Sequence, residues 1–221
     1  MNAIEQRASA WMRLPSGQRI DLANPDPHAW TDYDLSLRLA RVYRWGGESM
    51  HPVPLSVAQH SLAVLELRRQ WSPTPLTVDQ QLRELLHDAE EGLLGFDPIS
   101  KLKPLLGDAL REVTERLSDA VADRYRLPAW TDEDYAEHKR ADVTCAASEA
   151  LYCAGWSQYE IVNVLGIHEP VLKHDPLVEI YRCAPWQPWP SAVAVERFHL
   201  ELLRLLAARE PQRAANWRRI C

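Results

Sequence analysis

The sequence is poor in features that mark membrane, secreted or redox proteins. Its longest apolar runs fall far short of the roughly 20 residues that a membrane-spanning helix needs, and its start resembles neither a signal peptide nor a transit peptide. The four cysteines include no Cys-x-x-Cys pair, so we expect reduced thiols in a reducing compartment. These absences predict a cytoplasmic protein without a membrane partner.

Basic residues are fewer than acidic ones, 25 against 31, and the net charge is −6. Because duplex nucleic-acid binding depends on neutralising phosphates, this balance argues against a duplex nucleic-acid partner. A small phosphate ligand in a local basic pocket stays open. Phenylalanine is also scarce, with two Phe against nine Trp, and we expect most of the tryptophans in the core or covering it.

Sustained strand alternation is missing too, except near residues 13 to 22, where a turn between two short extended pieces predicts a small N-terminal β-hairpin. Residues 3 to 12 predict a short helix. With 221 residues and 46% hydrophobic content, the chain can build one good core. We predict an all-α single domain over 1–221, with a metal-binding core over about 32–153 and a C-terminal helical extension over about 154–221.

Capping motifs and apolar spacing place the helices. Ser56-Val57-Ala58-Gln59 and Thr77-Val78-Asp79-Gln80 are capping boxes. The second one predicts a helix that runs through His87 and Asp88 to Glu91, before two glycines end it. Further helices are expected over 31–44, 56–71, 107–126, 131–153, from Ser157, and over 191–209, with a Pro- and Trp-rich loop over 167–190.

Polar residues occur on helix faces that should be apolar. His60 shares a face with Val57, Val64 and Leu67, and Asp142 lies among small and apolar residues. A carboxylate in such a run is costly to desolvate unless it is paired or coordinated. Taken alone, His60 is more often a core histidine.

Two further polar residues, His87 and Asp88, adjoin each other after a Leu-Leu pair. With His60 and Asp142 they make a set of two imidazoles and two carboxylates from three helices. Such a set suits a divalent ion, with Mn, Fe, Co, Ni, Zn and Mg all open. The alternative for Asp142 is a salt bridge to His138 or Lys139.

Three segments together resemble the HD-domain phosphohydrolase superfamily, in the order H…HD…D: S-V-A-Q-H-S (56–61), L-H-D-A-E-E (86–91) and K-R-A-D (139–142). The resemblance covers roughly residues 32 to 150 and is closest to small bacterial and phage HD hydrolases related to the 5′-deoxynucleotidases. It implies an α-helical bundle that hydrolyses a phosphate ester or anhydride of a nucleotide. The metal ligands it implies are His60, His87, Asp88 and Asp142.

The resemblance also implies two residues that handle protons. Glu91 matches the Glu of HD-x-x-E, where it would orient or deprotonate a water. The related nucleotidases have an Asp five residues later, in a Gly-Asp-x-Pro context. Phe96 occupies that position here, and Asp97 comes one residue later. We assign the role of protonating group or second-metal ligand to Asp97; an Asp-Pro that only starts a loop is the alternative.

Arg44 and Trp45 resemble an Arg-aromatic pair at the pocket mouth of these relatives. An arginine suits phosphate, and a Trp ring suits a base or sugar. The alternative is an arginine that caps its own helix and a Trp in the core. Lys103 and Lys101 would add positive charge for a phosphate; a solvated lysine is the alternative for each.

The sequence therefore predicts a metal-dependent phosphohydrolase that acts on a small nucleotide substrate, as a nucleotidase or a nucleoside triphosphate hydrolase. The alternative from another class is a non-catalytic nucleotide-binding or regulatory HD module. Relatives are often dimers, so a homodimer with the C-terminal helix as its interface stays open.

Overall fold

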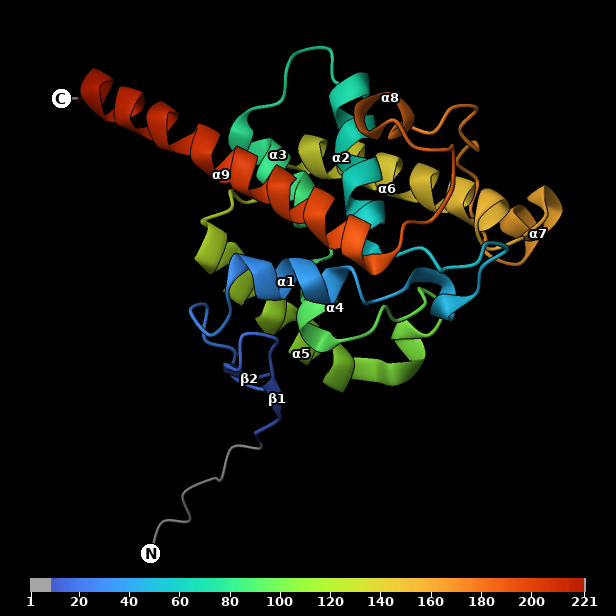
Figure 1. The fold of residues 1–221 in the computed structure, drawn as a ribbon, viewed down its shortest axis with the longest axis horizontal. Helices are drawn as coiled ribbons and strands as arrows, with labels where there is room; N and C mark the ends of the chain where they lie inside the picture. Colours follow the sequence, from blue (N-terminus) through green and yellow to red (C-terminus); the bar gives the residue numbers. More distant parts are fainter. Residues whose placement is uncertain (1–8, 221) are drawn as a thin grey trace, which may run out of the picture.

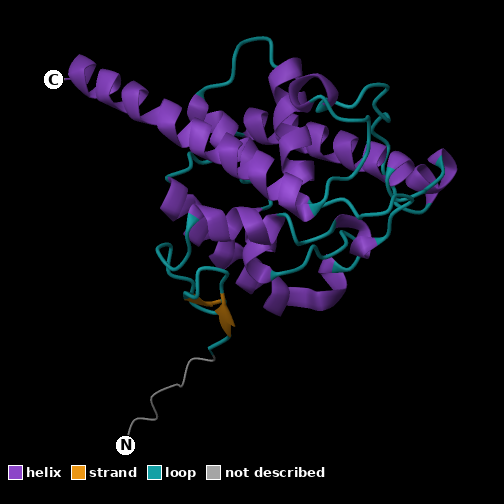
Figure 2. Ribbon diagram, viewed as in Figure 1, coloured by secondary structure: helices purple, strands orange, loops and turns teal. Residues whose placement is uncertain are grey.

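The computed structural model describes residues 9–220, with side chains as far as Arg209. The chain is mainly helical, with one two-stranded antiparallel sheet near its N-terminus (Figures 1 and 2). This confirms the predicted all-α fold with a small hairpin. Strand β1 (Trp11–Arg13) pairs with β2 (Arg19–Asp21), and Met12 lies opposite Ile20.

The helix predicted over residues 3 to 12 is wrong at its C-terminal end, because Trp11 and Met12 belong to β1. Its residues 3–8 lie outside the described part of the chain. The hairpin is favoured because the Ile20 side chain is fully buried in the core and the Asp21 carboxylate accepts a hydrogen bond from the Ala10 backbone N–H. Tertiary burial thus outweighs the local helical pattern.

Nine α-helices follow the hairpin within residues 9–220. The two predicted caps precede their helices, and three further helices begin in the same way. In each case the cap side chain accepts a hydrogen bond from the backbone N–H three residues later: Thr31, Ser56, Thr77, Thr131 and Ser157. The helices are α1 (Asp32–Leu39), α2 (Val57–Trp71), α3 (Val78–Leu85), α4 (Ala89–Leu94), α5 (Lys103–Tyr125), α6 (Asp132–Tyr152), α7 (Gln158–Asn163), α8 (Val178–Tyr181) and α9 (Ser191–Ile220).

Helix α2 is the centre of the bundle. Every residue from Val57 to Arg68 is buried, because α3, α6 and α9 all pack against this helix. Helix α9 also packs on α1, and its residues Phe198, Leu202 and Leu205 join the main core. In Figure 1 the C-terminal part of α9 extends beyond the rest of the molecule. A histidine in the first turn of α2 is therefore enclosed by neighbouring helices.

The helix predicted to run from Thr77 through Glu91 is interrupted, so that prediction was wrong. Helix α3 ends at Leu85, α4 begins at Ala89, and Leu86 and Asp88 have non-helical backbone angles. His87 closes the end of α3, since its Nδ1 lies 2.8 Å from the Glu84 carbonyl oxygen. The break gives α4 a direction of its own and leaves the His-Asp pair in a turn.

Gly92 explains why α4 packs closely on α1. A Cβ atom at this position would lie 2.8 Å from Cγ of Leu39, a clash in a fully buried contact. The Arg38 guanidinium donates hydrogen bonds to the carbonyls of Gly92 and Leu93 near the end of α4. This contact holds α4 across α1 and so sets where the preceding turn lies.

Three predicted segments differ in detail from the structure, the first being the helix expected over 31–44, which ends at Leu39. Helix α5 begins at Lys103, earlier than predicted, but its backbone is non-helical at Gly107, where the predicted helix began. The predicted loop over 167–190 contains the short helix α8. The cysteines within the described residues (Cys145, Cys153, Cys183) carry free thiols.

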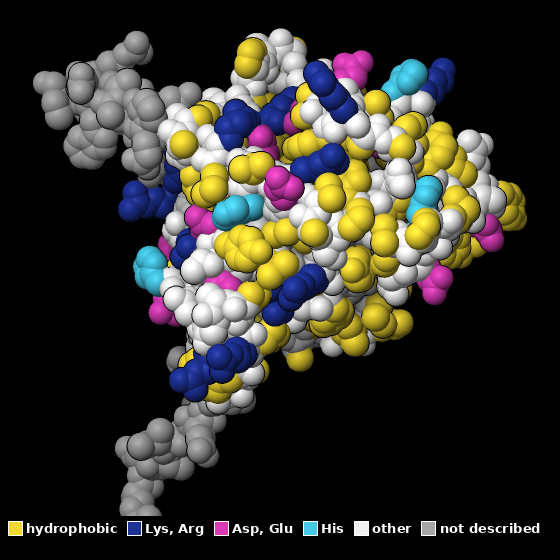
Figure 3. All heavy atoms as spheres, viewed as in Figure 1, with side chains coloured by type: hydrophobic (Ala, Val, Ile, Leu, Met, Phe, Trp, Pro, Cys, Tyr) yellow, Lys and Arg dark blue, Asp and Glu magenta, His cyan; other side chains and the backbone are white. Residues whose placement is uncertain are grey.

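The exterior mixes apolar and charged side chains. On the face in Figure 3, Lys and Arg side chains lie in separate groups among hydrophobic ones. Within the part of the chain that the structure describes, no helix has both the length and the apolar character that crossing a bilayer requires.

Candidate metal centre

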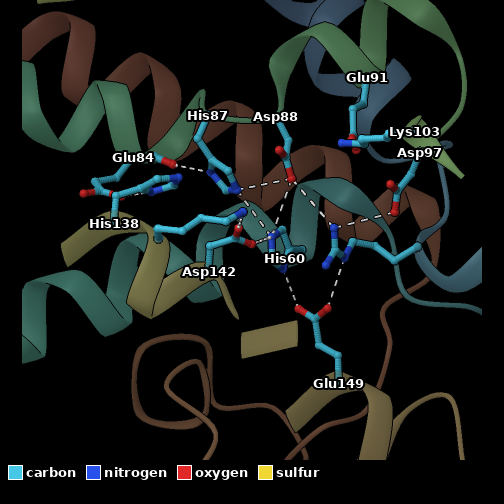
Figure 4. Close-up of polar contacts among 12 residues, drawn as sticks. His60, Glu84, His87, Asp88, Glu91, Asp97, Lys103, His138, Asp142 and Glu149 are labelled. Atoms are coloured by element: carbon cyan, nitrogen blue, oxygen red, sulfur yellow. Dashed lines mark hydrogen bonds and ion pairs between the residues drawn. The ribbon is translucent and has the colours of Figure 1, made fainter. Parts of the chain in front are cut away.

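Three donor atoms converge where α2 meets the turn between α3 and α4. His60 comes from α2, and His87 and Asp88 come from the turn (Figure 4). Nε2 of His60 lies 3.3 Å from Nε2 of His87, and Oδ2 of Asp88 lies 3.6 Å and 3.2 Å from these two nitrogens. All three atoms lie within 4.8 Å of one another. This His60–His87–Asp88 cluster could hold a metal ion.

The Nδ1 atom of each imidazole makes a hydrogen bond that favours metal binding by Nε2. Nδ1 of His60 lies 2.6 Å from Oε1 of Glu149, and Nδ1 of His87 lies 2.8 Å from the Glu84 carbonyl oxygen. Since a carboxylate and a carbonyl accept hydrogen bonds, each Nδ1 is the donor. Each Nε2 is then available as a lone-pair donor toward the cluster. Metal-binding histidines are held in this way in proteins, so these residues fit a divalent ion.

Asp142 on α6 adjoins the cluster. Its Oδ1 lies 3.2 Å from Nε2 of His60, while its Oδ2 lies 2.7 Å from Nζ of Lys139. Both the expected position beside the metal ligands and the alternative salt bridge to Lys139 are therefore present. The alternative partner His138 instead donates through Nδ1 to Oε2 of Glu84, at 2.7 Å.

The cluster concentrates opposite charges in a buried space. Burial lowers the pKa of His87, but the Asp88 carboxylate more than offsets this and raises it to about 9. Burial raises the pKa of Asp88, and the His87 imidazole overcomes that and holds it below its ordinary value. A divalent cation would replace protons between these groups, which is how metal binding couples to pH.

Arg44 places a guanidinium beside the cluster. It opens a single 3₁₀ turn (Arg44–Gly47), and its Nε donates to Oε2 of Glu149 at 3.1 Å. Its Nη1 lies 3.7 Å from Oδ2 of Asp88 and 3.6 Å from Oδ2 of Asp97. The guanidinium thus contacts carboxylates around the cluster, and its hydrogen-bond and ion-pair partners among the described residues include no carbonyl of the preceding helix α1.

Trp45 has an unusual backbone conformation, with φ of 58° and ψ of 27°. This left-handed region is uncommon for a bulky residue, and such strain is concentrated at functional sites. Trp45 lines a pocket of about 110 Å³ together with Arg44, Asp97 and apolar Ile99 and Leu165. It also packs against the smaller apolar core. Trp45 therefore packs against the core and also lines the pocket. Lys101 lines the same pocket.

The loop after α4 turns Asp97 toward the site and Phe96 toward solvent. Figure 4 shows the Asp97 carboxylate at the same side of the site as Glu91 and Lys103, and it contacts Arg44. The Phe96 side chain is 45% exposed. The Asp97 carboxylate, and not the Phe96 ring, therefore lies beside Arg44.

Glu91 and Lys103 form a separate pair beside the cluster. Oε1 of Glu91 lies 3.3 Å from Nζ of Lys103, and its Oε2 is buried without a hydrogen-bond partner among the residues that the structure describes. Burial, followed by the charges of Asp88 and Asp97, raises the pKa of Glu91 to about 10. Because α4 is a new helix, Glu91 is directed to Lys103 and lies apart from the two imidazoles (Figure 4). The continuous helix expected through His87, Asp88 and Glu91 is thus replaced by a turn and a new helix.

Sequence reasoning missed two acidic residues that support the site. Glu149 contacts His60 and Arg44, and Glu84 accepts hydrogen bonds from His138 and, at 2.8 Å, from Nε of Arg68. Glu149 follows Asp142 by seven residues, two helical turns along the same face of α6. That spacing was the available signal.

No family model matches the sequence. The chain is 38% identical over 164 residues to a protein of Rhodobacter capsulatus that is described as uncharacterized, and the match spans 74% of this chain and 83% of the relative. The chain belongs to the same family as this bacterial protein.

Proposed function

We propose that the protein is a metal-dependent phosphohydrolase of the HD-domain type, which cleaves a phosphate ester or anhydride of a nucleotide. The observation that carries this proposal is the position of Arg44 beside the cluster. Its Nη1 lies 3.7 Å from the Asp88 carboxylate, so a cation site and a guanidinium adjoin each other. That pairing suits a phosphate, which takes charge-assisted hydrogen bonds from Arg and binds to divalent ions.

The ion would be held by His60, His87, Asp88 and Asp142. Two imidazoles and two carboxylates accommodate Mn, Co, Mg, Ni, Fe or Zn. When bound, the ion supplies Lewis-acid polarisation of the phosphoryl group and a lower pKa for an attacking water. Each proposed ligand contacts at least one other in the structure, through His60 or His87, which supports a shared centre.

Glu91 and Asp97 are proposed to move protons. Glu91 is protonated at neutral pH because burial and two neighbouring carboxylates raise its pKa to about 10. Positive charge added at the cluster would lower this pKa and free the carboxylate as a general base. Asp97 contacts Arg44 and would pass to the leaving oxygen the proton that Glu91 removes from the attacking water. Lys103, at 3.3 Å from Glu91, adds positive charge for the phosphate.

A nucleotide substrate is favoured by the pocket next to Arg44. Trp45, Ile99 and Leu165 give it apolar walls, while Arg44 and Asp97 give it polar ones. A sugar or the edge of a base needs this combination of an apolar surface and a few placed polar groups. The phosphate would then lie at Arg44, between the pocket and the cluster.

The test is phosphate release from a panel of nucleoside mono- and triphosphates with Mn, Co, Mg or Ni, for the wild type and for Asp88→Ala. We expect Asp88→Ala to lose both bound metal and phosphate release, because one of the four proposed metal ligands is missing. Asp108→Ala, whose carboxylate is 83% exposed, is the matched control and should keep both.

Full activity of Asp88→Ala would overturn the proposal. Tight nucleotide binding by the wild type without release of phosphate from any nucleotide would instead support a non-catalytic nucleotide-binding or regulatory module.

A further inference from the structure

We infer that Glu149 is a positioning residue that joins the metal centre to the phosphate-binding arginine, because its two carboxylate oxygens hold His60 and Arg44 separately. This inference rests on the proposed function for the roles of those two residues. It concerns a residue that neither binds the metal nor touches the substrate in that proposal.

The contacts of Glu149 divide between its two oxygens. Oε1 accepts a hydrogen bond from Nδ1 of His60 at 2.6 Å, and Oε2 accepts one from Nε of Arg44 at 3.1 Å. Glu149 is only 3% exposed, so water does not compete for these bonds. In Figure 4 the Glu149 side chain rises from α6 on the side of His60 opposite Asp88. One carboxylate therefore holds both the His60 imidazole and the Arg44 guanidinium.

Each contact fixes a property that the chemistry needs. The bond to His60 keeps the proton on Nδ1 and leaves Nε2 free to bind a metal. The bond to Arg44 holds the guanidinium by Nε and leaves its Nη1 near Asp88 and Asp97. A shift of this carboxylate would disturb the metal ligand and the phosphate contact together.

Both contacts require a carboxylate and not merely a polar side chain. A glutamine has one accepting oxygen, and its NH₂ group can only donate. If the amide oxygen accepts the hydrogen bond from His60, the amide NH₂ faces the Nε–H of Arg44. If the oxygen instead accepts the bond from Arg44, the NH₂ faces Nδ1 of His60 and favours the His60 tautomer with the proton on Nε2. The variant Glu149→Gln keeps the shape and can satisfy only one partner, so at least one function must weaken.

The test measures two binding constants that need no turnover. Calorimetry gives the affinity of chelator-stripped protein for Mn, and then the affinity of the Mn-loaded protein for inorganic phosphate. We expect Glu149→Gln to weaken at least one of these affinities by about 10- to 100-fold, the range for groups that support metal ligands, and Glu149→Ala to weaken both. The matched control is Glu66→Gln, a buried carboxylate on α2 that pairs with Arg69 and should change neither.

An Arg44→Gln background separates the two contacts. There, Glu149→Ala should still weaken Mn binding, but it should cause no further loss of phosphate affinity. Unfolding by urea, run on every variant, gives the stability of each.

The inference is overturned if Glu149→Gln and Glu149→Ala lower stability and leave both binding constants as in the wild type. It is also overturned, together with the proposed function, if the wild type binds none of Mn, Co, Mg, Ni, Fe and Zn. If the wild type binds Mn and phosphate but hydrolyses no nucleotide, only the proposed function fails, and the two binding constants still decide the role of Glu149.

Discussion

The carboxylate of Asp142 is shared between His60 and Lys139. Its Oδ1 lies 3.2 Å from Nε2 of His60, and its Oδ2 lies 2.7 Å from Nζ of Lys139. The Lys139 side chain is 55% exposed, and exposed ion pairs contribute little to stability. One aspartate therefore contacts a buried histidine and an exposed lysine, and substitutions can separate the effects of the two contacts.

If Asp142 binds the metal, Asp142→Asn should weaken metal binding and Lys139→Gln should not. We expect Asp142→Asn to weaken Mn affinity by at least about 10-fold, because a charged ligand is lost. Lys139→Gln should leave the affinity unchanged or tighten it, because a competing cation is removed. Calorimetry on chelator-stripped protein measures both, with Arg140→Gln as the neighbouring control. Equal Mn affinity of Asp142→Asn and wild type would show that the aspartate serves only the salt bridge.

Asp97, and not Phe96, is predicted to take part in catalysis. Asp97 contacts Arg44 at the site, whereas Phe96 is exposed. Asp97→Asn should lower kcat by about 10²- to 10⁴-fold, the usual contribution of a general acid or base. Phe96→Ala should leave kcat within a factor of about three, since exposed substitutions rarely matter. Steady-state phosphate release measures both values, and the reverse ranking of the two variants would refute the assignment.

Glu91→Gln should stabilise the metal-free protein above neutral pH. The folded state raises the pKa of Glu91 from 4.5 to about 10, so between these values the folded protein holds a proton that the unfolded chain has lost. Stability therefore falls as pH rises through this window. Glutamine removes the dependence, so the gain in the free energy of unfolding should grow by up to about 1.4 kcal/mol per pH unit across this window.

Urea unfolding of chelator-treated protein from about pH 5 to pH 9 measures this gain. Glu112→Gln, an exposed position on α5, should follow the wild type at every pH. The prediction is wrong if the difference between Glu91→Gln and wild type stays constant across the range.

Gly92→Ala should destabilise the contact between α1 and α4. The added Cβ would lie 2.8 Å and 2.9 Å from Cγ and Cδ2 of Leu39, and overpacking of a core contact costs about 1 to 3 kcal/mol. Urea unfolding measures the loss. In a Leu39→Ala background the same substitution should cost less, because the clashing atoms are gone. An equal loss of stability in both backgrounds would show that the contact with Leu39 is not its cause.

The predictable parts of the fold are those set by contacts within a few residues. Thr31, Ser56, Thr77, Thr131 and Ser157 begin helices because each side chain meets a backbone N–H three residues away. Apolar spacing likewise grouped His60, Val64 and Leu67 on one face of α2, although the other faces of this helix are buried as well. The approximate positions of His60, His87, Asp88 and Asp142 followed from these helices.

The break between α3 and α4 could not be predicted in the same way. Leu85, Leu86 and Ala89 continue a helical pattern, so nothing local ends the helix there. The ending depends on α4 lying across α1, where Gly92 meets Leu39 and Arg38 binds the last carbonyls of α4. Because of the break, Glu91 contacts Lys103 and not the imidazoles. One continuous helix would not have placed Glu91 in this way.

By itself, the sequence determined an all-α fold with an N-terminal hairpin, the starts of its helices and the residue types of the candidate centre. Capping bonds and helical periodicity are local, so the order of residues encodes them. Only the tertiary structure decided that Glu149 would meet both His60, 89 residues earlier, and Arg44, 105 residues earlier. Such a contact exists because α2 and α6 pack together, and the direction of a buried side chain depends on every helix that encloses it.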